Sequence, residues 1–152
     1  MKKIVSLVMA SALWLMGCST SGNTLSPACK VHVYENRHSS QRYPQNDEEL
    51  EALIRELVGG TDDAYKQIVT SGDIKELKQQ QCVEIIFPNP LTIPVNDAKS
   101  ITMSKILIPL HRGDGDEVVF YCGRKTYFSP PYVNSKGARI LERIMQCVTT
   151  IP

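Results

Sequence analysis

Apolar and polar residues alternate over residues 30–35 of this chain. Val31 and Val33 fall on one side of the pattern, and His32 and Tyr34 fall on the other. A repeat of two residues predicts a half-buried β-strand, because successive side chains of a strand point to opposite faces of a sheet. The polar stretch that follows is expected to end this strand.

The repeat changes to that of a helix after Asn46. Asn46 and Glu49 have the spacing of a capping box, which marks the first turn of a helix. Apolar residues then recur three and four positions apart and form one stripe, which predicts an amphipathic helix. These residues are Leu50, Leu53, Ile54, Leu57 and Val58. Gly59 and Gly60 are expected to end the helix.

Two further helical segments are predicted before the next apolar run. The first covers 62–71, where four apolar residues recur at helical spacing and Gly72 ends the pattern. The four are Ala64, Tyr65, Ile68 and Val69. Asp73 and Glu76 then have the spacing of a second capping box, which is expected to begin a short turn that runs to Gln80.

The chain after Gln81 predicts strands and their turns. Strands are expected over 82–87, 100–110, 117–122 and 125–129, with a short edge strand over 91–95. Pro88-Asn89-Pro90 is expected to break the first of them. A change of inward parity between Met103 and Ile106 predicts a bulge near Ser104 or Lys105.

Turn residues and a last helix complete the pattern. Gly123-Arg124 has the form of a type II′ turn, and Pro130-Pro131 is expected to end the sheet. Ser135 is expected to cap the final helix. Its inward residues are Ile140, Leu141, Ile144, Met145 and Val148.

The element order β-α-α-β-β-β-β-α predicts an α+β fold with an antiparallel sheet. Consecutive strands without crossover helices pair in antiparallel fashion, and segregated helices cover mainly one face of the sheet. We expect about four to five strands and about three to four helices. Residues 29–152 are long enough for one domain with its own core.

The first eighteen residues have the order of an export signal. Lys2 and Lys3 precede an apolar run over 4–15, which is too short to span a membrane as a helix. The run ends in Leu15-Met16-Gly17-Cys18, which resembles the lipobox of bacterial lipoproteins. The alternative is an ordinary signal peptide in which the cysteine is coincidental.

The lipobox resemblance implies that a diacylglycerol is attached to the Cys18 thiol and that 1–17 is removed as a signal peptide. Acyl chains such as palmitate would then hold the chain at a membrane without a spanning helix. Residues 18–28 are small and polar after the cysteine, and we expect them to form a flexible tether. Ser19 after the cysteine implies, by the same resemblance, an outer-membrane location facing the periplasm if the cell is Gram-negative.

The nearly neutral net charge of the chain argues against a nucleic-acid partner. The chain has 17 Lys and Arg against 16 Asp and Glu, and the leader carries two of the lysines. The remaining charges are nearly balanced, whereas a nucleic-acid partner requires a basic face.

Four cysteines remain beyond Cys18, namely Cys29, Cys82, Cys122 and Cys147. An even number in an exported chain predicts two disulfides, for which three pairings exist. We favour Cys29 with Cys82 and Cys122 with Cys147. Buried free thiols are the alternative.

The sequence predicts no catalytic, metal or cofactor site. It lacks Gly-x-Ser-x-Gly, Ser-x-x-Lys and His-Glu-x-x-His motifs. Asp114-Gly115-Asp116-Glu117 has carboxylates spaced like the start of a calcium loop, but the rest of that pattern is missing, so a plain turn is expected.

An aromatic and basic cluster around the predicted hairpin over 111–132 is the candidate interaction surface. Its members are Tyr121, Arg124, Lys125, Tyr127 and Tyr132. Tyrosine and arginine are enriched at interface hot spots. The alternative is that the tyrosines close the second face of the sheet.

The sequence therefore predicts a lipid-anchored binding or assembly module that contacts another protein of the cell envelope through the hairpin surface. Two alternatives remain open. One is a hydrolase of peptidoglycan or another envelope glycan, and the other is an inhibitor or immunity-type lipoprotein that blocks an incoming enzyme.

Overall fold

The computed structural model describes residues 28–110, 115–127 and 130–149. Its strands are β1 (Lys30–Glu35), β2 (His38–Arg42), β3 (Asp63–Ala64), β4 (Cys82–Asn96), β5 (Lys99–Pro109), β6 (Val118–Gly123) and β7 (Tyr132–Asn134). Its helices are α1 (Asp47–Gly59), α2 (Ser71–Leu77) and α3 (Ala138–Thr149). All the strand pairs are antiparallel, and the sheet has the order β2-β1-β4-β5-β6-β7-β3.

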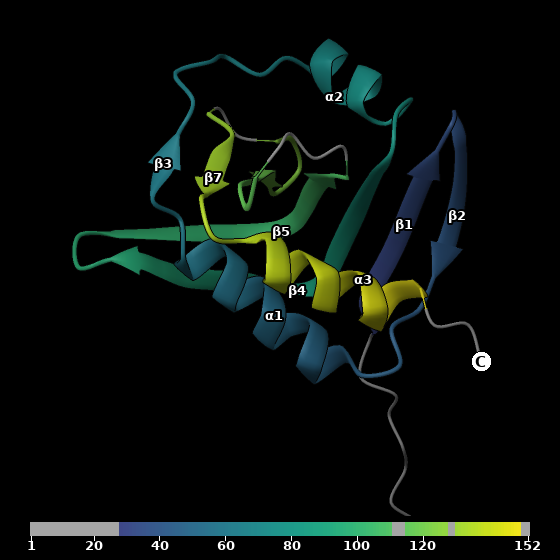
Figure 1. Ribbon diagram of the computed structural model, residues 1–152, viewed down its shortest axis with the longest axis horizontal. Helices are drawn as coiled ribbons and strands as arrows, with labels where there is room; N and C mark the ends of the chain where they lie inside the picture. Colours follow the sequence, from purple (N-terminus) through teal and green to yellow (C-terminus); the bar gives the residue numbers. More distant parts are fainter. Residues whose placement is uncertain (1–27, 111–114, 128–129, 150–152) are drawn as a thin grey trace, which may run out of the picture.

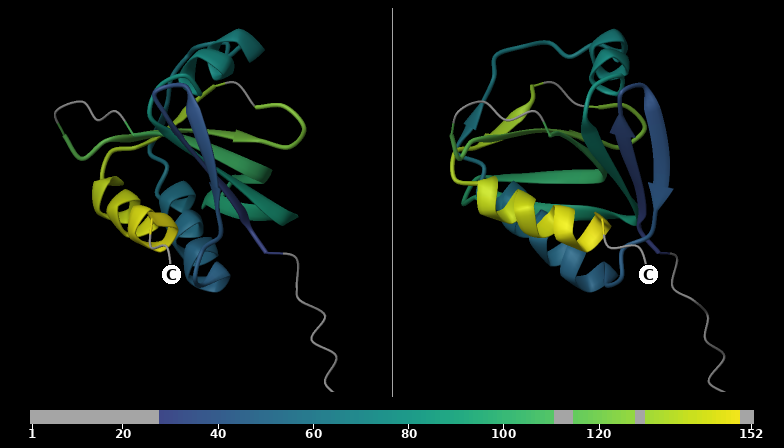
Figure 2. Two further views of the ribbon diagram at one scale, coloured as in Figure 1. Left: turned by 90° about the vertical axis from the view of Figure 1, so that its right-hand side faces the viewer. Right: turned by 45° about the vertical axis from the view of Figure 1, so that its right-hand side comes forward.

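The predicted α+β class and antiparallel sheet are confirmed. The described residues form seven strands, more than the four to five predicted, and three helices, within the predicted three to four. Helices α1 and α3 lie side by side on one face, whereas α2 lies on the other (Figures 1 and 2). The main core forms between the two long helices and the sheet, and a smaller cluster forms beneath α2.

A hairpin of β1 and β2 occupies one edge of the sheet. β1 is confirmed, with Val31 and Val33 buried. The strand ends before the polar stretch, as predicted, but β2 within that stretch was not predicted; Asn36 and Arg37 turn the chain into it. Both turn residues have positive φ, 49° and 68°, and Glu35 pairs with His38. Such a two-residue turn matches the twist of a hairpin.

Helix α1 follows the prediction closely. The Asn46 side chain accepts hydrogen bonds from the backbone N–H groups of Glu48 and Glu49, and the predicted stripe is buried. Gly60 is the C-cap, and a Cβ there would lie 2.5 Å from Nδ2 of Asn134. The same Nδ2 donates to the carbonyl oxygen of Leu57 at 2.9 Å. Gly60 is thus required by the close approach of a side chain that stabilises the end of α1.

The predicted helix over 62–71 is wrong. The backbone N–H groups of Asp62 and Tyr65 donate to the carbonyl oxygens of Val133 and Pro131, so this segment joins the sheet through β3. Of the four residues expected to face inward, Ile68 is 82% exposed. Pairing with a distant segment outweighs the local helical spacing.

Helix α2 begins one turn earlier than the predicted capping box. Thr70 is the N-cap, and its side chain and that of Asp73 form the reciprocal pair of hydrogen bonds. Asp73 is thus the third residue of the helix instead of its cap.

Strands β4 and β5 form a long two-stranded arm, at the left in Figure 1. Pro88-Asn89-Pro90 does not end β4, and it lies where the register shifts between Ile86 and Leu91. Met103, Ile106 and Ile108 of β5 all belong to the main core, which confirms the predicted change of parity. The additional residues of the irregularity lie in β4, opposite Ser104.

The two ends of β6 pair with different strands. The end of β6 pairs with β5, and its beginning pairs with β7. The expected type II′ turn at Gly123-Arg124 is wrong, since Gly123 does not have positive φ and forms only an isolated bridge with Tyr127. The sheet also does not end at Pro130-Pro131, because β7 follows directly.

Helix α3 begins at Ala138, not directly after Ser135. The Ser135 backbone N–H and hydroxyl both contact the Asp62 carboxylate, so this serine fixes the connection to β3 and is not a cap. Of the residues expected to face inward, Leu141, Ile144 and Val148 are buried, and Ile140 and Met145 pack beside them. Within the described ranges, no helix is long and apolar enough to span a membrane.

Candidate binding site on the second face of the sheet

Glu84 is a charged residue in the middle of an apolar strand. It lies in β4 between Val83 and Ile85, which face the main core, so its own side chain points toward the opposite face, beneath α2. Only 5% of the side chain is exposed. A buried carboxylate is strongly destabilising unless it is paired and hydrogen-bonded.

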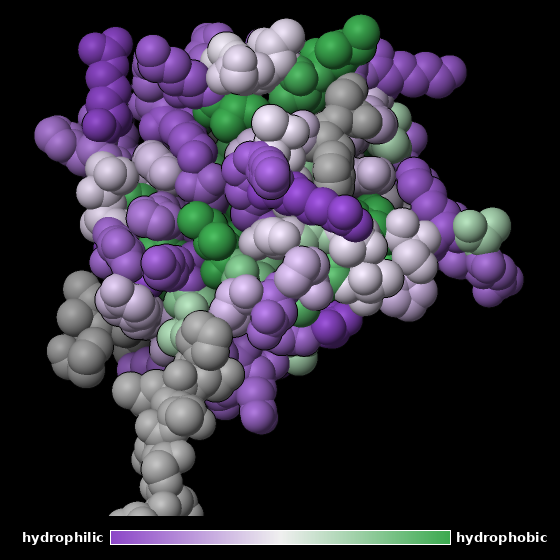
Figure 3. Space-filling model, turned by 180° about the vertical axis from the view of Figure 1, so that it is seen from behind, coloured by the Kyte–Doolittle hydropathy of each residue, from purple (hydrophilic) through white to green (hydrophobic). Residues whose placement is uncertain are grey.

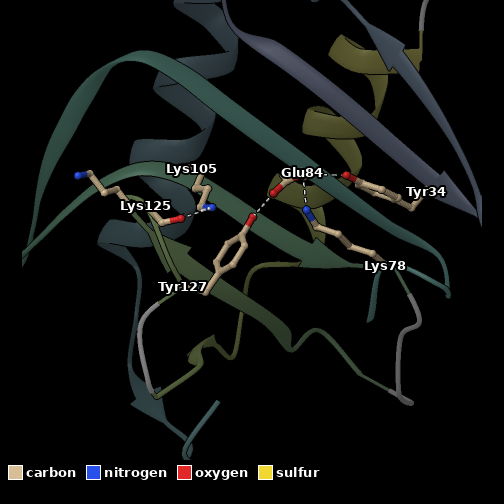
Figure 4. A network of polar contacts seen from close by, with 6 residues as sticks. All are labelled: Tyr34, Lys78, Glu84, Lys105, Lys125 and Tyr127. Atoms are coloured by element: carbon tan, nitrogen blue, oxygen red, sulfur yellow. Dashed lines mark hydrogen bonds and ion pairs between the residues drawn. The ribbon is translucent and has the colours of Figure 1, made fainter. Parts of the chain in front are cut away.

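Three donors satisfy the Glu84 carboxylate (Figure 4). The Tyr34 hydroxyl donates to Oε2 at 2.9 Å, and the Lys78 ammonium forms an ion pair with the same oxygen at 2.7 Å. The Tyr127 hydroxyl donates to Oε1. We call these four residues the Glu84 network. It joins β1, the chain just after α2, β4 and the segment after β6.

The protonation states in the Glu84 network follow from its contacts. Burial acts to raise the pKa of Glu84, but Lys78, Tyr127 and Tyr34 together hold that pKa below its ordinary value. Burial acts to lower the pKa of Lys78, and the Glu84 carboxylate nevertheless raises it. Burial and the same carboxylate raise the pKa values of both tyrosines. At neutral pH, Glu84 is therefore an anion, Lys78 a cation, and both phenols are protonated.

A pocket of about 490 Å³ lies beside the Glu84 network. It is lined by Val69, Thr70, Ser71, Ile74, Lys78, Lys105, Lys125, Thr126 and Tyr127. Because three of these residues are lysines and none is acidic, we call it the lysine pocket. Figure 3 shows the molecule from behind, where hydrophobic surface is visible between hydrophilic side chains.

Lys105 and Lys125, unlike Lys78, form no ion pair with a carboxylate of the described residues. The Lys105 ammonium donates to the carbonyl oxygen of Lys125 at 2.9 Å and lies 4.6 Å from the centre of the Tyr127 ring. Both partners are uncharged. Among the ion pairs of the described residues, none involves Lys105 or Lys125. Figure 4 shows the Lys125 side chain extending away from Lys105, so the pocket holds the Lys105 charge and has the Lys125 charge beside it, neither with a carboxylate partner among the described residues.

The residues of the predicted interaction surface are only partly brought together. Tyr121 and Tyr127 pack in the cluster beneath α2, and Arg124 and Lys125 are exposed beside them. Tyr132 is buried in the main core and stacks on Phe120, with ring centres 6.0 Å apart. Tyr132 is therefore on the wrong face of the sheet for this surface.

Other parts of the predicted hairpin surface are not placed. Residues 111–114 and 128–129, which include His111 and Asp114, lie outside the described residues. Within the described ranges, no group of three His, Cys, Asp or Glu side chains is arranged to hold a metal ion.

The sequence analysis missed Glu84 and Lys78. The signal for Glu84 was present, because a single acidic residue interrupts the apolar run over 82–87. Such a residue in a strand buried on both faces requires a partner. The identity of the partners has no local signal, since Tyr34 and Tyr127 are 50 and 43 residues away in the chain.

All four cysteines of the described residues are free thiols in the structure. The predicted disulfide between Cys29 and Cys82 does not fit this fold, because the two residues are too far apart. Cys82 is opposite Tyr34 in the register of β1 and β4, whereas Cys29 precedes β1, about 16 Å along the strand. The two thiols also belong to clusters on opposite faces of the sheet. A disulfide requires Cα atoms within about 7 Å.

The thiols have reduced nucleophilic character. Burial raises the pKa of Cys29 to about 11 and the pKa values of Cys82 and Cys122 to about 12. Burial also raises the pKa of Cys147. Thiolates are the reactive form of cysteine, so the raised pKa values lower the reactivity of these groups at neutral pH.

A second pocket, of about 650 Å³, lies between α1, α3 and the end of β7. Its lining mixes Glu56 and Asp62 with Lys136, Arg139 and Arg143. Arg143 lies within 4.0 Å of Glu56, so opposite charges already face each other there. This pocket has no uniform charge and gives a weaker indication of a ligand than the lysine pocket.

Comparisons with known protein families, with curated proteins and with solved structures find no match for this chain.

Proposed function

We propose that this chain is a lipid-anchored lipoprotein of the cell envelope that acts as a binding module and contacts another envelope protein through the lysine pocket and the adjoining Arg124. The observation that carries the proposal is the pocket itself. It presents lysines without an acidic lining residue, and part of its lining belongs to α2, which lies at the end of the molecule away from the start of β1 (Figure 1).

The position of the pocket relative to the anchor supports this proposal. The backbone N–H of Cys29 donates to the Asp47 carboxylate at 3.3 Å, so the described chain starts beside the beginning of α1. Tyr34, near the other end of β1, belongs to the Glu84 network. The six residues of β1 extend over about 20 Å. A lipid on Cys18 would thus join the domain at the end where β1 starts, opposite the end where α2 lies (Figure 1).

The length of the proposed tether is compatible with contact between neighbouring envelope proteins. Residues 19–27 extend over at most about 30 Å when fully stretched. The domain would therefore stand near the membrane surface, and its partner would be membrane-bound or peripheral to the same membrane.

A hydrolase is the less favoured alternative. A glycan hydrolase needs a carboxylic acid whose pKa is raised so that it donates a proton near neutral pH. Glu84 is the buried carboxylate of the described residues, and its pKa is lowered by three donors that occupy both of its oxygens. An inhibitor or immunity-type role differs from the proposal only in whether the partner is foreign, and it stays an alternative.

The proposal is tested by capture of the partner from living cells. A tagged chain is crosslinked in cells and purified with its partners, in parallel with an Arg124→Glu/Lys125→Glu variant. Reversal of two charges at the pocket is expected to remove one discrete partner, because like charges at an interface oppose association. An Arg42→Glu/Lys30→Glu variant is the matched control, since these residues lie on β2 and β1, away from the pocket.

The control variants and a cell-wall assay show which results would contradict the proposal. The control variant is expected to capture the partner as the unchanged chain does, and Cys18→Ala is expected to lose it with the anchor. Equal capture by the unchanged chain and the Arg124→Glu/Lys125→Glu variant would exclude this surface. Release of fragments from cell-wall sacculi by the purified chain would favour the hydrolase instead.

A further inference from the structure

The lysine pocket has the features of a preformed receptor for an anionic group. The Lys78 ammonium is neutralised by Glu84 at 2.7 Å. Those of Lys105 and Lys125 have no carboxylate partner among the described residues, and the Lys125 side chain extends away from Lys105 beside the pocket (Figure 4). Positive charge without a carboxylate partner in and beside a concave site favours a ligand that brings negative charge.

The Glu84 network fixes the position of Lys105 indirectly. The Tyr127 hydroxyl is held by the Glu84 carboxylate, so the tyrosine ring cannot turn freely. The Lys105 ammonium lies over that ring and is bonded to the carbonyl oxygen of Lys125. A charge that is already in place loses little conformational entropy when a ligand binds. The buried anion therefore serves to position a cation that it does not contact.

The walls of the pocket indicate the size and character of the ligand. Val69 and Ile74 supply apolar surface, and Thr70, Ser71 and Thr126 supply backbone or hydroxyl groups at the rim. A short aliphatic stem that ends in a charged group matches this combination. The volume of about 490 Å³ is within the range of small-molecule sites and exceeds the volume of one side chain.

Other charges near the pocket limit the strength of binding without reversing its sign. Asp73 is close to the rim, where its carboxylate accepts hydrogen bonds from the Thr70 hydroxyl and backbone N–H. That carboxylate is exposed to solvent, which screens its repulsion of an incoming anion. Glu84 is already paired with Lys78.

We infer that the lysine pocket binds carboxylate side chains of an acidic segment of the protein partner. Lysines attract carboxylates and phosphates alike as single point charges, and the carboxylate is the anion that an unmodified protein segment supplies. This inference rests on the proposed function for the identity of the ligand as a protein segment. The pocket's affinity for carboxylates is tested without any partner.

The test is an NMR titration of the isotope-labelled full chain, purified in detergent, with the dipeptide N-acetyl-Glu-Glu-amide. Saturable changes are expected in the backbone amide signals of Lys125 and Thr126. Lys125→Gln and Lys105→Gln are each expected to weaken binding by about tenfold, as befits loss of a charged hydrogen bond. Lys30→Gln is the control, because Lys30 is exposed on β1 and lies outside the pocket.

Two reference ligands complete the test. N-acetyl-Gln-Gln-amide, which has the same shape without charge, is expected to give no saturable change. Inorganic phosphate at equal ionic strength is expected to bind more weakly than the acidic dipeptide, because it has no aliphatic stem. The inference is overturned if the acidic dipeptide gives no saturable change, if the neutral dipeptide binds equally, or if phosphate binds more tightly.

The two proposals fail in different ways. If the Arg124→Glu/Lys125→Glu variant loses its partner in cells but the acidic dipeptide does not bind, the proposed function stands and the carboxylate inference falls. If the dipeptide binds but capture in cells is unchanged by charge reversal, the pocket is a carboxylate site and the partner binds elsewhere.

Discussion

Glu84 shows how one residue connects the packing of this protein to its proposed activity. Its carboxylate is buried, bound by Tyr34, Lys78 and Tyr127, and placed beside the lysine pocket. Ion pairs of this kind contribute little net stability compared with apolar packing, but removal of one partner is destabilising. The residue is therefore expected to matter both for folding and for the order of the pocket.

The substitution Glu84→Gln is expected to destabilise the fold. It removes the charge that pairs with Lys78 and weakens the hydrogen bonds from both phenols, at a cost of about 2–3 kcal/mol in the free energy of unfolding. Urea unfolding at pH 7 measures this change. Glu35→Gln, at an exposed site on β1, is the control and is expected to change stability by no more than about 0.5 kcal/mol.

The difference between the unchanged chain and Glu84→Gln is expected to depend on pH. The pKa of Glu84 is lowered in the folded state from 4.5, so its contribution is complete above about pH 4.5 and is lost as the pH falls further. Unfolding curves for the two chains should converge in that acidic range. Equal stability of the two chains at pH 7 would contradict the role given to this carboxylate.

For single residues, the sequence shows that a buried charge needs a partner, but it does not show which residue that partner is. An acidic residue within an apolar strand indicates that a partner exists. The partners come from three other segments of the chain, and only the tertiary fold brings them together. The same reason explains why Tyr132, grouped by sequence with Tyr127, lies on the other face of the sheet.

The secondary-structure elements were predicted well where one face is buried and one is exposed. α1 and β1 have this character, and both were confirmed with their buried residues. β2 was missed because its residues are almost all exposed, so no apolar alternation marks it. The predicted helix over 62–71 failed because backbone pairing with β7 and with Pro131 outweighs its local pattern.

The turn between β1 and β2 offers a test of element stability. Arg37 has φ of 68°, a region that costs an ordinary residue about 1–2 kcal/mol and costs glycine almost nothing. After the greater loss of chain entropy for glycine, Arg37→Gly is expected to stabilise the protein by about 0.5–1 kcal/mol. The change is measured as a higher urea midpoint with an unchanged slope.

A second glycine substitution separates turn geometry from a general effect of glycine. Ser39→Gly lies within β2, where extended backbone gives glycine no advantage, and it is expected to lower stability by about 0.5–1 kcal/mol. If Arg37→Gly lowers the midpoint as Ser39→Gly does, the two-residue turn is not the conformation of this hairpin in solution.

At the scale of the whole molecule, the two faces of the sheet have different roles. One face carries α1, α3 and the main core, which supply most of the buried apolar surface. The other face carries α2, the Glu84 network and the lysine pocket, and it is only partly covered. The first face accounts for folding, and the second is the one we assign to binding.

The whole-molecule arrangement was only partly accessible from the sequence. The α+β class follows from the order of patterns along the chain. The position of the pocket beside α2 depends on the strand order and on α2 lying on the second face, neither of which has a local signal. The resemblance of residues 15–18 to a lipobox predicts an anchor, and the fold shows that the described chain starts at the end opposite α2.

The central claim is that an anchored domain presents its second face to a protein partner. The most direct measurement places a photo-crosslinking amino acid at Thr126, on the lysine pocket, or at Gln45, an exposed position beside the start of α1, in chains produced in their own cells. We expect one discrete crosslinked protein from Thr126, its loss when Cys18→Ala removes the anchor, and no such product from Gln45. A product from Gln45 with none from Thr126 would show that the partner binds at the end of the molecule where the chain starts, and it would overturn the proposal.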